Sequence, residues 1–173
     1  MKYILDFDRT LFDVEGLYLA LEEKEQRHLA GTTESLLLLD PADFLFPDVI
    51  DFLKKHKKED LFILSSSQGI TADWTEDYQA EKIERTGLSE YVAEVIVMKG
   101  GKGEFVRDLV ADFPEDNFAF IDDQAEQCIS VKNMSPEVEC FVVKRDDENR
   151  ELDETVDGFR IIKSLFDLSK LLQ

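Results

Sequence analysis

Short hydrophobic runs alternate along the chain with longer stretches in which apolar residues recur at helical spacing. The runs are rich in Val, Ile, Leu and Phe and end at turn residues, a pattern typical of strands buried on both faces of a parallel sheet. The pattern predicts five strands, at residues 3–5, 61–64, 95–98, 118–121 and 141–143, and a last short strand at 159–162.

Helical patterns lie between these strands, at residues 47–57, 74–86, 104–112 and 165–172. Strands and helices in alternation favour an open α/β sheet with right-handed connections. The mostly acidic stretch 144–157 is expected to be a solvated loop before the last strand.

Composition adds a size and a charge to this picture. The chain has 173 residues, 43% of them hydrophobic, which suffices for one compact domain with a real core. Its 39 acidic and 20 basic side chains give a net charge of −19, which would repel nucleic acid and anionic membranes. We therefore expect no general nucleic-acid binding and no membrane partner, and the oligomeric state stays open. The basic cluster is expected to be the solvated end of a helix and consists of Lys54, Lys55, Lys57 and Lys58.

The cysteine count and the N-terminus indicate a compartment. Cys128 and Cys140 are too few for a disulfide scaffold and suit a reducing environment as small buried residues. No apolar run approaches the roughly 18 residues of a membrane span, and acidic Asp6 interrupts any signal-peptide pattern. A cytoplasmic location is expected.

Polar clusters that suit phosphate chemistry follow four of the predicted strands. In open α/β sheets the ligand binds outside the carboxyl ends of the strands, so these clusters are the candidate site. The residues concerned are Asp6 and Asp8 after the first strand, Ser65 after the second, Lys99 and Lys102 after the third, and Asp122 and Asp123 after the fourth.

The aliphatic strand followed by Asp6, Asp8, Thr10 and Leu11 resembles the first motif of the haloacid dehalogenase superfamily of phosphohydrolases. The later clusters follow in that family's order, so the resemblance extends over nearly the whole chain. Each later motif is weak alone, and the four in register carry the identification. The resemblance implies a Rossmann-like three-layer sandwich with a central parallel sheet of about five strands, in the phosphatase branch with a small cap.

The resemblance also implies roles for individual residues. Asp6 would be the nucleophile that forms an aspartyl-phosphate. Asp8 would be the general acid and then the general base, and its presence argues against dehalogenation, because members that cleave carbon–halogen bonds lack an acid at this position. Ser65 would donate a hydrogen bond to a phosphoryl oxygen. Lys102 would offset the negative charge of Asp6 and the phosphoryl group. Lys102 is preferred to Lys99, the alternative, because Lys102 directly precedes a helix N-terminus.

A Mg²⁺ ion is the cofactor that the resemblance implies, because attack on a phosphoryl dianion requires positive charge and Mg²⁺ prefers hard oxygen ligands. Its ligands would be the carboxylate of Asp6, the backbone carbonyl of Asp8 and one acid of the pair Asp122–Asp123. Asp123 is the preferred direct ligand and Asp122 its neighbour, with the reverse assignment left open.

Two residues of the first motif raise separate questions. Arg9 occupies a position where many members carry Gly. Either the turn here needs no positive φ, or Arg9 places a cation near the substrate. The favoured interpretation of its side chain is an exposed arginine that pairs with surface acids. Thr10 is expected to stabilise the turn through its hydroxyl group.

The segment 14–44 is too long for an ordinary connection between two elements, and its apolar residues recur at helical spacing. This pattern predicts a small helical cap. The predicted division is a core of residues 1–13 and 45–173 with a cap of residues 14–44. The expected function is hydrolysis of a phosphomonoester. The expected substrate is a small molecule or another phosphorylated compound. The alternatives are a phosphomutase with the same intermediate and a non-catalytic binding module of the same fold.

Overall fold

A computed structural model describes residues 1–66, 76–145 and 155–172. Within these ranges the chain forms one seven-stranded sheet in the order β3-β2-β1-β4-β5-β7-β6. The strands are β1 (Lys2–Leu5), β2 (Leu61–Ser66), β3 (Glu94–Met98), β4 (Phe118–Asp122), β5 (Glu139–Val143), β6 (Thr155–Val156) and β7 (Phe159–Ile162). Neighbouring strands are parallel except for β6, which pairs antiparallel with β7.

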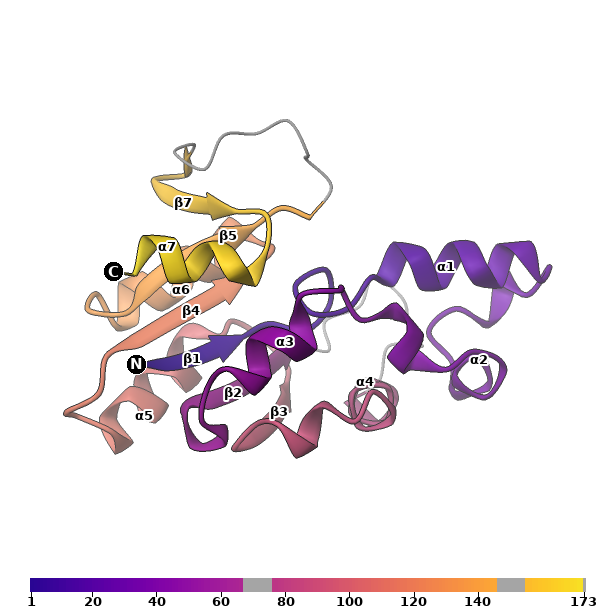
Figure 1. Ribbon diagram of the computed structural model, residues 1–173, viewed down its shortest axis with the longest axis horizontal. Helices are drawn as coiled ribbons and strands as arrows, with labels where there is room; N and C mark the ends of the chain where they lie inside the picture. The colour runs from indigo at the N-terminus through magenta and orange to yellow at the C-terminus, as the bar shows by residue number, and fades with distance from the viewer. Residues whose placement is uncertain (67–75, 146–154, 173) are drawn as a thin grey trace.

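Helices cover both faces of the sheet, as Figure 1 shows. The α-helices are α1 (Val14–Glu23), α2 (Thr33–Leu38), α3 (Val49–Lys54), α4 (Glu76–Arg85), α5 (Gly103–Asp112), α6 (Ala125–Met134) and α7 (Leu168–Leu171). Short 3₁₀ helices lie at η1 (Arg27–Leu29), η2 (Pro41–Phe44), η3 (Lys58–Asp60), η4 (Leu88–Glu90) and η5 (Leu165–Asp167).

Successive residues of the central strands point to opposite faces, as the pleat requires. In β1, Tyr3 and Leu5 belong to a core cluster shared with α3 and α7, whereas Ile4 belongs to a second cluster shared with α5 and α6. Both faces are therefore apolar, which explains why the central strands have continuous hydrophobic sequences.

The α/β class and the five predicted strands are confirmed, and the predicted last strand joins the same sheet as β7. Among the strands and α-helices of the described residues, β6 and α6 were not predicted. β6 has only two residues, at the end of a stretch expected to be loop. α6 follows β4 and buries the small residues Ala125, Cys128 and Val131, which give a weak helical pattern. The predicted start of a helix at Trp74 lies outside the described residues.

The expected cap segment folds mainly as helix. Residues 14–44 form α1, η1, α2 and η2, and Figure 1 shows α1 and α2 on the side of the molecule toward which the β1 arrow points. The Arg85 guanidinium of α4 donates to the Leu36 carbonyl of α2 at 3.0 Å, so α2 is joined to the core. The division at residues 13 and 45 stays a prediction.

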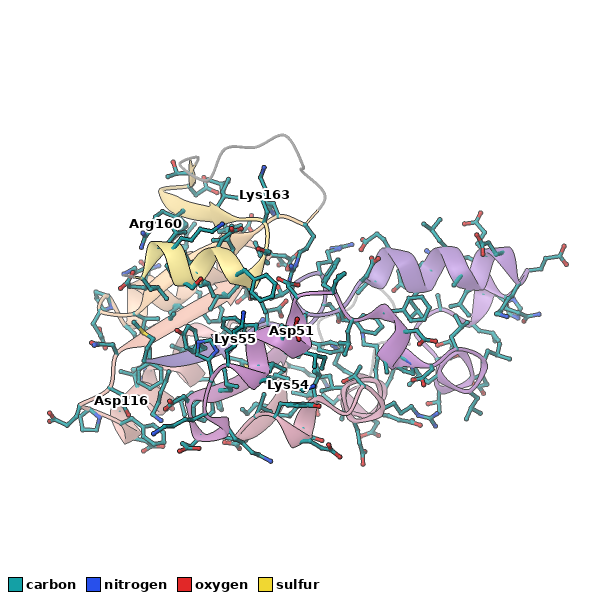
Figure 2. All side chains as sticks on the ribbon, viewed as in Figure 1. Asp51, Lys54, Lys55, Asp116, Arg160 and Lys163 are labelled. Carbon is teal, nitrogen blue, oxygen red and sulfur yellow. The ribbon has the colours of Figure 1, made fainter. Side chains whose placement is uncertain are left out.

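The basic cluster lies where a solvated helix end was expected. Figure 2 labels Lys54, the last residue of α3, and Lys55, which follows it, and all four lysines of the cluster are exposed. The cluster precedes the first residue of β2, so it lies at the end of the sheet opposite the carboxyl ends of the strands. None of the helices in the described ranges is both long and apolar enough to cross a membrane.

Candidate active site

Strand register brings the first and fourth clusters together. β1 lies between β2 and β4, so the chain leaves β1 toward one side of the sheet and later returns to its other side. Leu5 pairs with Ile121, and the Asp6 amide donates to the Ile121 carbonyl at 2.8 Å. Asp6 and Asp122 therefore leave adjacent strands at the same level, at the position where open α/β sheets bind ligands.

Lys102 joins these two carboxylates. Its Nζ donates to Asp6 Oδ1 at 2.5 Å and to Asp122 Oδ2 at 2.7 Å, and all three side chains are buried. Burial lowers the pKa of Lys102, but the carboxylates of Asp6 and Asp122 raise it by more, so the ammonium form is favoured. Lys99 lies elsewhere: its side chain is 72% exposed and faces Glu76 at 3.7 Å. The geometry thus brings Lys102, and not Lys99, to Asp6.

The glycines around Lys102 serve backbone geometry. Gly100 has a φ of 101°, a conformation that favours glycine. A Cβ on Gly103 would lie 2.4 Å from the Ser130 carbonyl oxygen of α6, so only glycine allows α5 to begin so close to α6. Gln127 of α6 also accepts a hydrogen bond from the Lys102 amide at 3.1 Å. The unpredicted helix α6 therefore helps to place Lys102.

The site contains a group of three carboxylates, those of Asp6, Asp122 and Asp123. One oxygen of each lies within 4.8 Å of the others. Asp122 is bound twice, by Lys102 and by the Gln124 amide, which donates to Oδ1 at 2.9 Å. Asp123 is only partly buried, and within the described chain no hydrogen bond or ion pair reaches its carboxylate. Asp123 is thus the acid of the pair whose carboxylate oxygens accept no hydrogen bond from the described residues.

This donor set fits a divalent cation. The Lys102 ammonium binds two of the three carboxylates, those of Asp6 and Asp122, so the group holds more acids than cations in direct contact. The pKa of Asp6 is raised to about 8, chiefly by burial, with Lys102 lowering it and Asp122 and Asp123 raising it. Burial, together with Asp122, likewise raises the pKa of Asp123 to about 6. Crowded carboxylates of this kind suit a hard cation that binds oxygen.

Asp8 lies beside this group with a separate set of partners. Its Oδ1 accepts a hydrogen bond from Lys82 Nζ at 2.6 Å, and its Oδ2 accepts one from Gln79 Nε2 at 2.7 Å. The same Gln79 nitrogen donates to Ser65 Oγ at 2.8 Å, so Ser65 is joined to Asp8 through one amide. Lys82 and Gln79 both belong to α4 and are fully or almost fully buried.

Sequence reasoning missed Lys82 and Gln79 because neither follows a strand. The signal that could have found them is the buried face of α4, where Tyr78 and Ile83 are the apolar neighbours of these two polar residues. A lysine and a glutamine on the apolar face of a helix require polar partners inside the protein.

The turn after Asp8 confirms the favoured interpretation of Arg9 but not the expectations about the backbone φ and the Thr10 hydroxyl. Arg9 has a φ of 62°, so the turn does adopt a left-handed conformation, and the suggestion that it needs no positive φ is wrong. Arg9 is exposed and pairs with Glu15 of α1 at 2.7 Å, which is the favoured interpretation. The expected role of the Thr10 hydroxyl is also wrong, because that oxygen is buried and forms no hydrogen bond with any residue that the structure describes.

Backbone contacts and Arg145 hold this turn in place of the Thr10 hydroxyl. The Phe7 carbonyl accepts hydrogen bonds from the amides of Leu11 and Phe12, at 2.8 and 3.0 Å. Arg145 donates to the Thr10 carbonyl from Nη2 at 2.6 Å and pairs with buried Asp48 through Nη1 at 2.8 Å. Arg145 therefore connects the end of β5 to the loop that carries Asp8.

The segment α1 contributes an aromatic residue near the site. Burial raises the pKa of Tyr18 to about 12, and the Asp8 carboxylate contributes to the rise, so the phenol lies within electrostatic range of Asp8. The guanidinium of Arg27 lies 4.0 Å from the centre of the Tyr18 ring. Asp8 is thus one of the charged groups that act on Tyr18, a residue of the expected cap.

Known structures share this fold at low sequence identity. A haloacid dehalogenase-like hydrolase from Burkholderia xenovorans is similar with a TM-score of 0.65 and 15% identity, over 98% of this chain and 94% of that one. A dehalogenase solved as an intermediate complex is similar with a TM-score of 0.63 and 12% identity, over 98% and 96%. A haloacid dehalogenase-like family hydrolase from Streptococcus pneumoniae is similar with a TM-score of 0.62 and 12% identity, over 99% and 98%.

No protein-family model and no curated protein matches the sequence. The similarity to solved structures spans almost the whole length of both chains, so it establishes the fold of the haloacid dehalogenase-like hydrolases for this protein. The expected resemblance in fold is confirmed.

Proposed function

We propose that this protein is a Mg²⁺-dependent phosphatase that hydrolyses a phosphomonoester through an aspartyl-phosphate on Asp6. The observation that supports the proposal is a group of four side chains at the carboxyl ends of the central strands, with the Asp8 carboxylate beside them. The four are Asp6, Lys102, Asp122 and Asp123. A carboxylate nucleophile, one ammonium and a further pair of carboxylates that can hold a cation are the groups that phosphoryl transfer to a carboxylate requires.

In the first step, an oxygen of Asp6 attacks phosphorus and the bond from phosphorus to the leaving oxygen breaks. Asp8 gives its proton to that oxygen, so the product leaves as an alcohol. Lys102 stays bound to Asp6 Oδ1 and offsets the charge of the phosphoryl group. A Mg²⁺ ion held by Asp6, the Asp8 carbonyl and Asp123, with Asp122 beside it, would supply further positive charge.

In the second step, water attacks the phosphorus of the aspartyl-phosphate and Asp8 takes a proton from that water. Phosphate leaves and Asp6 is regenerated as a carboxylate. Ser65 accepts a hydrogen bond from Gln79, which leaves its own hydroxyl proton available to a phosphoryl oxygen. Asp8 is the residue that favours phosphate over halide chemistry, because dehalogenation leaves no oxygen to protonate.

The substitution Asp6→Asn tests the nucleophile. Asn is nearly isosteric with Asp but is a poor nucleophile, so phosphate release in Mg²⁺ should fall by roughly 10³-fold or more. The measurement is release of inorganic phosphate from a panel of sugar phosphates, nucleotides, phosphopeptides and an aryl phosphate. Asp51→Asn is the matched control, because Asp51 is exposed on α3, as Figure 2 shows, and its substitution should leave the rate unchanged.

Three outcomes would contradict the proposal in different ways. Substantial phosphate release by the Asp6→Asn variant would show that another residue attacks. Transfer of the phosphoryl group to a second position of the substrate without release would favour a mutase. Halide release from a haloacid, without phosphate release from any ester, would favour a dehalogenase.

A further inference from the structure

We propose that Lys82 and Gln79 are positioning residues that fix the Asp8 carboxylate, and with it Ser65, in the orientation needed for proton transfer to the leaving oxygen. The inference rests on the proposed function and adds residues that the first-motif resemblance does not contain. Lys82 and Gln79 are three positions apart on α4, so both side chains point from one face of the helix.

The two residues occupy one oxygen of Asp8 each. Lys82 binds Oδ1 and Gln79 binds Oδ2, so rotation of the carboxylate would break both hydrogen bonds. A carboxylate accepts about four hydrogen bonds, so each oxygen keeps a position that can carry the proton for the leaving oxygen or receive one from water. The contacts therefore orient the carboxylate without blocking it.

The surroundings of Lys82 indicate that stability is not the reason for a lysine here. Its side chain is 1% exposed, and its Nζ lies 5.1 to 5.4 Å from the ring centres of Phe7, Phe12 and Tyr78. An apolar side chain would fill such a place well, and buried ion pairs are weak contributors to stability. The contact of Nζ with Asp8 Oδ1 is one that methionine could not make.

Gln79 extends the arrangement to a second site residue. Only its NH₂ group can donate to a carboxylate, so Nε2 must face Asp8, and the same nitrogen donates to Ser65. Its Oε1 is buried without a hydrogen-bond partner in the described chain. Leaving that oxygen unpaired is unfavourable, so the orientation of the amide is set by Asp8 and Ser65.

The test compares leaving groups in single-turnover experiments with the full chain, Mg²⁺ and enzyme in excess. An alkyl phosphate needs a proton on its leaving oxygen, whereas 4-nitrophenyl phosphate releases a stable anion without one. In Lys82→Met, release of the alcohol from the alkyl ester should slow by about 10-fold or more, while release of nitrophenolate should change little. The later release of phosphate should slow for both substrates, because water attack uses Asp8 in both.

Controls separate positioning from folding. Gln79→Leu removes the other donor and should show the same selectivity for the leaving group, so the inference stays testable if Lys82→Met does not fold. Lys58→Met removes an exposed lysine at the opposite end of the sheet and should behave as wild type. Circular dichroism and Tm report whether each variant is folded.

The outcomes are distinguishable from failure of the proposed function. Equal slowing of alcohol release and nitrophenolate release in folded Lys82→Met and Gln79→Leu would overturn the positioning role while the phosphatase proposal stands. A wild-type rate in both variants would also overturn it. If the wild-type protein releases phosphate from no ester, the proposed function fails and this inference fails with it.

Discussion

Arg9 shows how the backbone hydrogen bonds of a turn can hold a single residue in an unfavoured local conformation. Its φ of 62° is a left-handed conformation that costs a residue with a Cβ roughly 1 kcal/mol. The Arg9 side chain binds Glu15, but this exposed pair contributes little by itself. The conformation is therefore maintained by the backbone hydrogen bonds of the turn, and the Arg9 side chain does not determine it.

Substitutions at position 9 can measure this strain. Arg9→Gly and Arg9→Ala both remove the pair with Glu15, and only glycine also relieves the left-handed backbone. Arg9→Gly should be more stable than Arg9→Ala by about 1 kcal/mol in urea unfolding, after the greater unfolded-state entropy of glycine is included. Equal stability of the two variants would show that the turn relaxes when the side chain is shortened.

Residues at the ends of strands could be predicted from the sequence, and their contacts follow from register. Asp6 and Asp122 are the examples: each comes directly after or at the end of an apolar run, and parallel pairing of β1 with β4 places them side by side. Lys82 could not be found this way, because it lies 74 positions from Asp8 and its partner depends on the packing of a helix face. The failure at Thr10 has a similar cause, since which donors reach the turn depends on Arg145, 135 positions away.

At the scale of elements, the limits of prediction follow the strength of each periodic pattern. The central strands are continuous apolar runs and were identified, whereas α6 buries mainly small side chains and was not. α6 matters to the site nevertheless, because Gln127 and Ser130 accept hydrogen bonds from the backbone of Lys102 and Gly103. Close contact between α5 and α6 is thus part of what directs Lys102 to Asp6.

Substitution of two nearby glycines tests that contact. A Cβ on Gly103 would meet the Ser130 carbonyl at 2.4 Å, so Gly103→Ala must displace one helix and should lower the unfolding free energy by about 1–3 kcal/mol. Gly101→Ala is the milder comparison, because its Cβ would meet only the Ser130 hydroxyl at 3.2 Å, which can turn away with the loss of one 3.3 Å hydrogen bond from the Gly103 amide. Thermal and urea unfolding measure both. If Gly103→Ala is as stable as Gly101→Ala, the two helices do not constrain each other as the geometry indicates.

At the scale of the whole molecule, the charged side chains behind the net charge of −19 are unevenly distributed. Three acids gather at the carboxyl ends of β1 and β4, where they fit a cation. The exposed lysines after α3 lie at the opposite end of the sheet and cannot draw an anion toward the site. An anionic substrate must therefore approach against the average field of the protein and depends on positive charge at the site itself.

Salt dependence of substrate capture follows from this arrangement. Screening is weak at about 0.01 M salt, where the Debye length is about 30 Å, and strong at about 0.15 M, where it is about 8 Å. Added salt weakens the long-range repulsion from the net charge more than it weakens contacts within the buried site. We therefore expect kcat/KM for a phosphomonoester to rise or stay constant between these salt concentrations, measured as phosphate release at saturating Mg²⁺.

A control for the metal makes this result interpretable. Salt can also weaken cation binding, so the Mg²⁺ concentration must be raised until the rate no longer depends on it at either salt concentration. An uncharged inert solute of matched osmolality separates screening from effects on water. A steep fall in kcat/KM with salt would mean that attraction by Lys102, Arg9 and bound Mg²⁺ extends beyond the site and outweighs the net charge, which would contradict the expectation.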